Sequence, residues 1–341
     1  RSIMVLQMYS EEGGNAVTRP PMKSPRITNE GSKEGGDHPP PPPSPSTQGM
    51  LQRLRVELRA PLDEPPIASS GHSAVYASSS LLHVYGRMVA VKLINKRALH
   101  KSIADKFLPR ELEITVLEMN LQVSHPHLVS TLRVIEDVSL SRIAIIQEFY
   151  PNGTLLRLLL KEGSIEECPR GAHIFRQLSE AVHYLHTRSI VHRDIKPENI
   201  LIDSNGDIRL GDFGFARFIE KRERSRSFCG TRPYSAPQIV SYRPYDPRAA
   251  DWFAMGVVLY TMITGKWPQE PVSSATARFN TPKVPSPACC QLILSLLDED
   301  EYERGDYDVV VHSEWLASRP KWLFASATHV YEVRREEESI D

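Results

Sequence analysis

The chain has 341 residues, of which 40% are hydrophobic and 24% charged, so it can build one large domain or two lobes with a sizeable core. A formal net charge of -1 gives no overall attraction to nucleic acid or to an anionic membrane, and we expect neither as a partner. Four cysteines without CxxC spacing exclude a usual zinc site and indicate a reducing compartment. We therefore expect a cytoplasmic protein, with the nucleus left open.

Residues 1–50 are rich in Gly, Pro, Ser and charge, and include the run DHPPPPPSPST from Asp37 to Thr47. Such a run favours extended polyproline II and offers few apolar side chains to bury. We therefore expect residues 1–50 to form a disordered tail. A proline run is more often a plain linker, but a partner of the SH3 or WW type is the alternative.

Residues 51–147 have the pattern of a small sheet with one helix. Apolar runs predict strands at SAVYAS, MVAVKLI, LVSTLRVI and RIAIIQEF, and ADKFLPRELEITVLEM predicts the helix. After Pro151 the pattern becomes helical, and HIFRQLSEAVHYLH places its apolar residues on one face. The fold class is therefore α+β.

The lobe boundaries follow from this change of pattern. We expect a sheet-rich lobe over 51–147, a hinge over 148–152, a helical lobe over 153–318 and a short charged tail over 319–341. The longest apolar stretch, Trp252–Ile263, is shorter than the about 20 residues that a bilayer requires and indicates a buried helix.

Two polar motifs lie next to short apolar runs in the second half of the chain. HRDIKPEN begins at His192 and GDFGFAR begins at Gly211. Between them they supply oxygen atoms on Asp194, Asn199 and Asp212. Carboxylate and amide oxygens, completed by water and substrate phosphates, are ligands that Mg²⁺ accepts. The combination fits phosphoryl transfer.

These motifs, with VAVK ending at Lys92, CGTRPYSAP from Cys229 and DWFAMGVVLY from Asp251, follow the order found in eukaryotic protein kinases. The segments FLPRE, FRQLSEAVHYLH, IVHRDIKPEN, DFGFAR and SFCGT resemble the calcium/calmodulin-dependent-like group, and most closely the testis-specific serine kinase family. The resemblance covers residues 54–318. It implies a bilobal protein-kinase fold and a serine/threonine protein kinase acting on protein substrates.

The resemblance assigns catalytic roles. Asp194 would accept the proton of the substrate hydroxyl, Lys196 would neutralise the transferring phosphoryl group, and Asn199 and Asp212 would hold Mg²⁺. His192 and Phe213 would pack beneath the site, and Asp251 would accept backbone N–H bonds from the catalytic loop.

The resemblance also assigns ATP contacts. Lys92 would contact the phosphates, and Glu111 would fix the position of Lys92. The remaining nucleotide contacts implied are Ala68, Ser70, Gly71, Ser73, Val75, Ala90, Gln147, Glu148, Tyr150 and Leu201.

Regulation is implied by Arg193, beside the catalytic aspartate, and by Arg217, because arginines near such a site bind a phosphate. Ser227 occupies the usual activating position, and Thr231 that of the threonine that contacts Asp194. The plain alternative is a solvated basic loop. Glu198 would be one acidic group of the substrate groove, which implies a weak preference for arginine-containing peptides.

Two departures from the family pattern favour a rival hypothesis. Ala68, Ser70 and Ser73 stand at the three glycine positions of the phosphate-binding loop, with Gly71 displaced by one, so we expect weakened ATP binding. Pro65 and Pro66 also interrupt the first strand.

The second departure is Gln238, which replaces a glutamate whose usual partner is an arginine, here Arg304. A pseudokinase scaffold is therefore the alternative to an enzyme, and a proline-rich adaptor explains too little of the chain. The enzyme is favoured because the four residues that degenerate kinases commonly lose are all present: Lys92, Asp194, Asn199 and Asp212.

Overall fold

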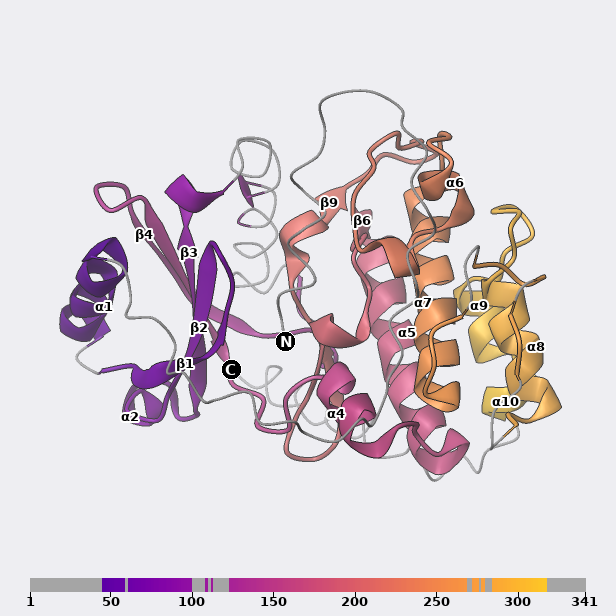
Figure 1. Ribbon diagram of the computed structural model, residues 1–341, viewed down its shortest axis with the longest axis horizontal. Coiled ribbons are helices and arrows are strands. Elements are labelled where there is room, and N and C mark those ends of the chain that lie inside the picture. Colours follow the sequence, from indigo (N-terminus) through magenta and orange to yellow (C-terminus); the bar gives the residue numbers. More distant parts are fainter. Residues whose placement is uncertain are drawn as a thin grey trace, which may run out of the picture. The chain divides into compact units, whose positions relative to one another are not determined.

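The computed structural model describes residues 45–58, 61–99, 108–109, 112, 123–268, 272–275, 277–279 and 284–317. These residues fall into two compact units (Figure 1). Among the described residues, the first unit comprises those within 45–153 and 201–219, and the second those within 154–200 and 220–317.

The first unit contains a five-stranded antiparallel sheet, as expected. Its strand order is β1-β2-β3-β5-β4. The strands are β1 (Asp63–Ser69), β2 (Ser73–Ser78), β3 (Val89–Asn95), β4 (Thr131–Asp137) and β5 (Arg142–Glu148), and the short helix α2 (Leu82–Tyr85) lies between β2 and β3. The pairing of β1 with β2 shifts register between Asp63 and Ala68. This interval contains Pro65 and Pro66, which lack the N–H groups that a regular ladder requires.

The two faces of the sheet bury separate apolar clusters. On β3, Val91 and Leu93 are 0% and 3% exposed and pack with Ile146 of β5 on one face. Ile94 packs with Ile143 and Ile145 in the other cluster. Because side chains alternate along a strand, Lys92 is directed away from the face of Val91 and Leu93.

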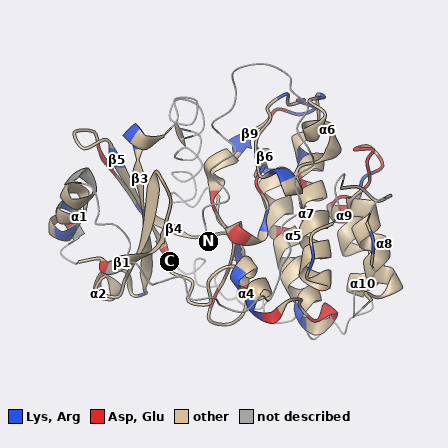
Figure 2. Ribbon diagram, viewed as in Figure 1, with Lys and Arg blue, Asp and Glu red and all other residues tan. Residues whose placement is uncertain are grey.

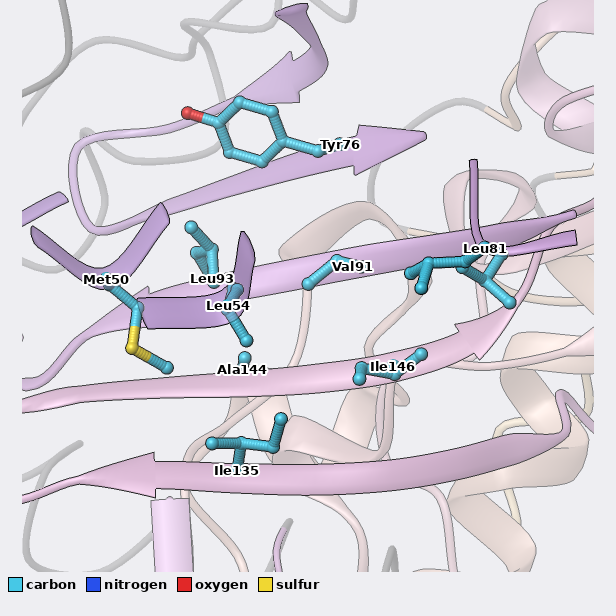
Figure 3. Packing of buried hydrophobic residues seen from close by; sticks show 10 residues of the cluster. Met50, Leu54, Tyr76, Leu81, Val91, Leu93, Ile135, Ala144 and Ile146 are labelled. Atoms are coloured by element: carbon cyan, nitrogen blue, oxygen red, sulfur yellow. The ribbon is translucent and has the colours of Figure 1, made fainter. Parts of the chain in front are cut away.

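The helix α1 (Pro45–Leu58) packs on the Val91 face of the sheet (Figure 3). Met50 and Leu54, four residues apart on one side of the helix, are both 0% exposed. Nη1 of Arg53 donates to Oδ2 of Asp137 at 2.5 Å. Hydrogen bonds from Ser139 and from Arg53 hold the pKa of Asp137 below its usual range.

This helix corrects the expected tail. We predicted disorder over residues 1–50, but residues 45–50 are helical and Met50 belongs to the core. The apolar face formed by Met50, Leu51 and Leu54 outweighs the Pro- and Ser-rich composition before it. Residues 1–44 lie outside the described residues.

The second unit is helical, as expected. Its elements are α4 (Leu155–Glu162), α5 (Ala172–Thr187), α6 (Pro237–Val240), α7 (Pro247–Thr264), α8 (Pro287–Leu296), α9 (Tyr307–Val311) and α10 (Glu314–Ala317). Helix α7 packs against α5 and α8, and nearly all of its residues are buried. The apolar stretch Trp252–Ile263 is therefore a core helix, as predicted. Within the described parts of the chain, no helix has both the length and the apolar character needed to cross a bilayer.

Short elements carry the two polar motifs. They are β6 (Ile190–Val191), the turn Pro197–Asn199, β7 (Ile200–Ile202), β8 (Ile208–Leu210), the turn Phe213–Phe215 and β9 (Arg217–Phe218). We expected one continuous helical lobe over 153–318, but Leu201–Ile219 belongs to the first unit. The reason is local pairing, since Val129 N–H donates to Leu210 O at 2.9 Å and Leu210 N–H donates to His127 O at 2.9 Å.

We predict that Leu54→Ala lowers the free energy of unfolding by about 2–5 kcal/mol, because it removes a fully buried side chain and leaves a cavity. Urea unfolding of the full chain measures this loss. Val56→Ala on the same helix is the control, because Val56 is 70% exposed. Equal midpoints for the two variants would show that α1 does not stabilise the sheet.

Candidate active site

A buried carboxylate near the start of α7 holds the backbone of the catalytic loop. Asp251 is 1% exposed. Its Oδ1 accepts the N–H of Arg193 at 2.7 Å, and its Oδ2 accepts the N–H of His192 at 2.9 Å. Nε2 of His186 lies 2.9 Å from the same Oδ2. The backbone contacts expected of Asp251 are therefore present.

The charge of Asp251 is maintained by its partners. Burial by itself would raise the pKa of Asp251, but the hydrogen bond from His186 and the nearby ring of His192 outweigh burial, so the pKa lies below the ordinary value. The loop that this carboxylate holds contains Arg193 at φ 64, a conformation that side-chain-bearing residues rarely adopt.

Asp194 lies at the centre of a hydrogen-bonded group of four side chains. Nζ of Lys196 donates to Oδ2 of Asp194 at 2.6 Å, and Oγ1 of Thr231 donates to Oδ1 at 2.8 Å. Lys196 also donates to Oγ1 of Thr231 at 2.8 Å. Nδ2 of Asn199 donates to the backbone oxygen of Asp194 at 2.9 Å. The expected contact between Thr231 and Asp194 is therefore present.

His192 and Phe213 have the surroundings of packing residues, as we expected. His192 is 0% exposed, and its Nδ1 accepts the N–H of Asp194 at 3.3 Å. Phe213 is 3% exposed. A ring that is engaged with the backbone and closed to solvent is poorly placed to exchange protons with a substrate.

Glu198 combines burial with an unsatisfied acceptor. Burial raises the pKa of Glu198, the charge of Asp194 raises it further, and Lys196 opposes the rise. Among the described residues, its Oε2 is buried without a hydrogen-bond partner. A carboxylate in this condition gains most from a cationic ligand.

The first unit brings together Lys92 and Asp212, which are 120 positions apart in the sequence. Nζ of Lys92 lies 3.1 Å from Oδ1 of Asp212, and the side chains are 23% and 48% exposed. Asp212 has a left-handed backbone at φ 60. Glu111, the expected partner of Lys92, lies outside the described residues.

Hydrogen bonds between Ser70 and Ser73 close the loop that is predicted to bind phosphate. The N–H of Ser70 donates to Ser73 O at 2.7 Å. The N–H of Ser73 donates to Oγ of Ser70 at 3.1 Å, and the two hydroxyl oxygens lie 2.9 Å apart. A Cβ at Gly71 would meet nothing within 4 Å, so the chain does not need glycine there for space. One amide that a glycine-rich loop offers to phosphate is thus occupied by Ser70.

His72 is a neighbour of Lys92 that the sequence motifs did not indicate. It lies at the tip of this loop, between β1 and β2, and its backbone oxygen accepts the N–H of Asn95 at 2.8 Å. Burial lowers the pKa of His72, the charge of Lys92 lowers it further, and Asp212 opposes the fall. The ring is therefore within electrostatic range of both residues. No spacing rule assigns a histidine to this position, so only the structure identifies it.

Four of the predicted nucleotide contacts lie on or beside the same sheet. Ala90 pairs with Gln147 across β3 and β5, and Nε2 of Gln147 donates to Oγ1 of Thr131 at 3.1 Å. Glu148 N–H donates to Ser130 O at 3.0 Å. Tyr150 is 5% exposed.

Two further residues of the predicted nucleotide set are also in this unit. Val75 pairs with Lys92, and Leu201 lies on β7. A Cβ at Gly211 would lie 3.9 Å from a methyl carbon of Leu201 and 2.5 Å from Cγ2 of Val129, which requires glycine before Asp212. The contacts of these residues with ATP stay predictions.

The residues predicted to be regulatory belong to both units. Arg217 is on β9 in the first unit, and Arg193 and Ser227 are in the second. Ser227 donates its N–H to Oγ of Ser225 at 3.2 Å and accepts the hydroxyl of Tyr245 at 2.9 Å through its backbone oxygen.

Gln238 and Arg304 form the hydrogen bond that we expected. Nη2 of Arg304 donates to Oε1 of Gln238 at 3.1 Å, and Nε and Nη1 donate to the backbone oxygens of Asp298 and Ala249. Burial lowers the pKa of Arg304 to about 10. Arg304 is 7% exposed, and the oxygens that accept its hydrogen bonds here are neutral.

Asp212 of the first unit and Asn199 of the second each offer an oxygen of a kind that suits magnesium better than zinc. Among the described residues, no group of three or more His, Cys, Asp or Glu side chains is arranged around a common metal position. Asp212 offers a half-exposed carboxylate, and Asn199 uses its amide nitrogen for Asp194, so its carbonyl oxygen is the atom to face an ion. Mg²⁺ accepts a few such oxygens when phosphates and water complete its shell.

Comparisons with known proteins agree with this geometry. Residues 71–316 match the protein kinase domain. Testis-specific serine/threonine-protein kinase 1 of Mus musculus is 31% identical over 253 residues, which are 70% of this chain and 67% of that protein. Testis-specific serine/threonine-protein kinase 4 of Homo sapiens is 32% identical over 258 residues, 69% of this chain and 76% of that protein.

A third relative is longer than this chain. NUAK family SNF1-like kinase 1 of Mus musculus is 38% identical over 183 residues, which cover 54% of this chain but only 27% of that protein. The predicted resemblance to the testis-specific serine kinases is confirmed. The fold, the motifs and the comparisons agree, and the chain belongs to the protein kinase family.

Proposed function

We propose that this chain is a serine/threonine protein kinase that transfers the γ-phosphoryl group of ATP to Ser or Thr hydroxyls of protein substrates. One observation carries the proposal: the carboxylate of Asp194 accepts hydrogen bonds from a lysine ammonium and from a threonine hydroxyl in a buried site. An ordinary surface turn does not bury such a group.

The hydrogen bond from Thr231 supports the role of Asp194. Oδ1 of Asp194 already accepts an aliphatic hydroxyl at 2.8 Å. A substrate Ser or Thr hydroxyl in a similar position would donate its proton to this carboxylate as the oxygen attacks phosphorus. Lys196, fixed by Asp194 and Thr231, would offset charge on the transferring group without having to reorganise.

The metal would be held by the carboxylate of Asp212 and the amide oxygen of Asn199. When bound, Mg²⁺ neutralises charge on the phosphates. Lys92 would contact the α- and β-phosphates. In the structure its ammonium contacts Asp212 at 3.1 Å, so nucleotide binding would compete with this ion pair.

Substrate selection follows from the condition of Glu198. Its buried Oε2 lacks a hydrogen-bond partner among the described residues, and a peptide arginine would supply one. We infer a weak preference for arginine-containing peptides.

The pseudokinase alternative is not supported, because the matched relatives carry kinase names and the residues of the catalytic group are all present. A cytoplasmic location remains a proposal, consistent with the absence of a disulfide among the four described cysteines. A partner of the SH3 or WW type for the proline run is a proposal from sequence alone, since most of the run lies outside the described residues.

The direct test incubates the purified chain with ATP, Mg²⁺ and a generic peptide library, beside Asp212→Asn. We expect phosphate in Ser and Thr peptides and a loss of about 100-fold or more in the variant, which loses a metal-binding charge. Equal signals from the two proteins would favour a scaffold.

We predict that Ser227→Ala lowers the activity of chain prepared with a phosphorylated loop by at least about tenfold, because it removes the charge-assisted bonds of a phosphate. Initial rates with a saturating peptide, and mass spectrometry of the loop, provide the measurement. Full activity with an unphosphorylated loop would contradict this role for Ser227.

We predict that Ser70→Ala tightens ATP binding by about 2- to 10-fold, because it removes the hydroxyl that occupies the Ser73 amide. Calorimetric titration gives the Kd. Ser69→Ala is the matched control in the adjoining strand. If Ser70→Ala binds ATP no more tightly than the control, the serine pair does not compete with the nucleotide.

A further inference from the structure

The segment that contains Ser227 is hydrogen-bonded to other parts of the second unit without a phosphate. We call residues 220–231 the phosphosite loop. The N–H of Ser225 donates to Tyr245 O at 2.8 Å, and the N–H of Tyr245 donates to Ser225 O at 3.0 Å. Ser225 is 3% exposed. The hydroxyl of Tyr245 adds a bond to the backbone oxygen of Ser227 at 2.9 Å.

Arg224 adds a charged attachment beside this bridge. Its Nη2 donates to Oε1 of Glu301 and, at 2.6 Å, to the backbone oxygen of Pro244. Its Nη1 lies 3.2 Å from the hydroxyl of Tyr302. The hydrogen bond to Glu301 is the foremost cause of a raised pKa at Arg224. One side chain thus joins the phosphosite loop to two other segments.

Glu301 is enclosed although it lies in an acidic loop. The loop between α8 and α9 carries Asp298, Glu299, Asp300, Glu301 and Glu303 (Figure 2). The side chain of Glu301 is only 5% exposed, whereas that of Arg224 is 40% exposed. Oε2 of Glu301 also accepts the N–H of Asp246 at 3.0 Å, just before α7. A buried carboxylate that accepts hydrogen bonds from two partners is held in a fixed position, unlike the carboxylate of an exposed surface ion pair.

The same acidic loop is hydrogen-bonded to Gln238, whose side chain carries no charge. Nε2 of Gln238 donates to the backbone oxygen of Glu299 at 2.6 Å, and Arg304 donates to Oε1 of Gln238. An amide gives Arg304 a hydrogen bond but no opposite charge. The charged contact is found three positions earlier, between Glu301 and Arg224.

We propose that Glu301 is a positioning residue for peptide docking: its ion pair with Arg224 anchors the phosphosite loop and supplies the charge-assisted contact that Gln238 cannot make with Arg304. Anchored in this way, the loop presents Thr231, at its end, to Asp194 before any phosphate is added. The anchoring can be tested apart from catalysis, but its effect on peptide use rests on the proposed kinase function.

The two partners differ in a way that predicts unequal effects. Removing Glu301 leaves an arginine whose side chain is 40% exposed, so water can solvate it. Removing Arg224 leaves a carboxylate that is 5% exposed and has lost its counter-charge. Arg224→Gln should therefore release the loop at least as strongly as Glu301→Gln.

The experiment exposes the full chain to trypsin and identifies the cuts by mass spectrometry. Lys221, Arg222 and Arg226 are exposed cleavage sites in the phosphosite loop. We expect Glu301→Gln and Arg224→Gln to be cut there on the order of tenfold faster than the unmodified chain, as expected for the loss of a hydrogen-bonded charge. Glu299→Gln is the matched control, because Glu299 is exposed in the same acidic loop.

Peptide kinetics and a rescue variant complete the test. Glu301→Gln should raise the KM for peptide severalfold and leave the KM for ATP unchanged. Adding Gln238→Glu to this variant gives Arg304 a carboxylate and should restore both slow cleavage and the KM for peptide. A general loss of folding would raise cleavage across the chain and would not be rescued.

The outcomes separate the two proposals. Cleavage of both variants at the rate of Glu299→Gln overturns the anchor, even if the chain phosphorylates peptides. Rapid, rescuable cleavage in a chain without peptide phosphorylation supports the anchor and overturns the proposed function. Rapid cleavage that Gln238→Glu does not reverse contradicts the proposal that the Glu301–Arg224 ion pair supplies the charge missing from the Gln238–Arg304 contact.

Discussion

The carboxylate of Asp251 is the constraint on which the catalytic half of the structure depends. It satisfies the backbone N–H groups of His192 and Arg193 inside the protein, where an unpaired amide would cost on the order of 1–3 kcal/mol. These bonds stabilise the left-handed conformation of Arg193. The next residue is Asp194, whose side chain is then fixed from three sides by Lys196, Asn199 and Thr231. The position of the Asp194 carboxylate therefore depends on the buried charge of Asp251.

Where this chain departs from the usual kinase sequence, the structure provides local hydrogen bonds instead. Ser70 and Ser73 close the phosphate-binding loop through their own side chains. Gln238 keeps a hydrogen bond to Arg304 without charge. These substitutions have different consequences. The serine pair occupies the backbone amide of Ser73, whereas the side-chain amide of Gln238 preserves a hydrogen bond without supplying a charge.

Much of the fold and of the site could be predicted from the sequence because the signals are local. The apolar run MVAVKLI predicted β3, and the spacing of Asp194, Lys196 and Asn199 indicated the catalytic loop. The helical state of residues 45–50 was missed because composition dominated over the short apolar face of Met50 and Leu54. The pair of Arg224 and Glu301 was also missed, since its members are 77 positions apart and belong to no motif. His72 had no spacing signal at all.

The most direct measurement of the central claim is phosphate transfer to three peptides that share one basic sequence and differ only in a Ser, Thr or Tyr acceptor. The purified chain is supplied with ATP and Mg²⁺, and Asp194→Asn serves as the control. The account predicts phosphate on the Ser and Thr peptides, little on the Tyr peptide, and loss of all transfer in the variant. Transfer that is absent from the unaltered chain, or that is unchanged in Asp194→Asn, would contradict it.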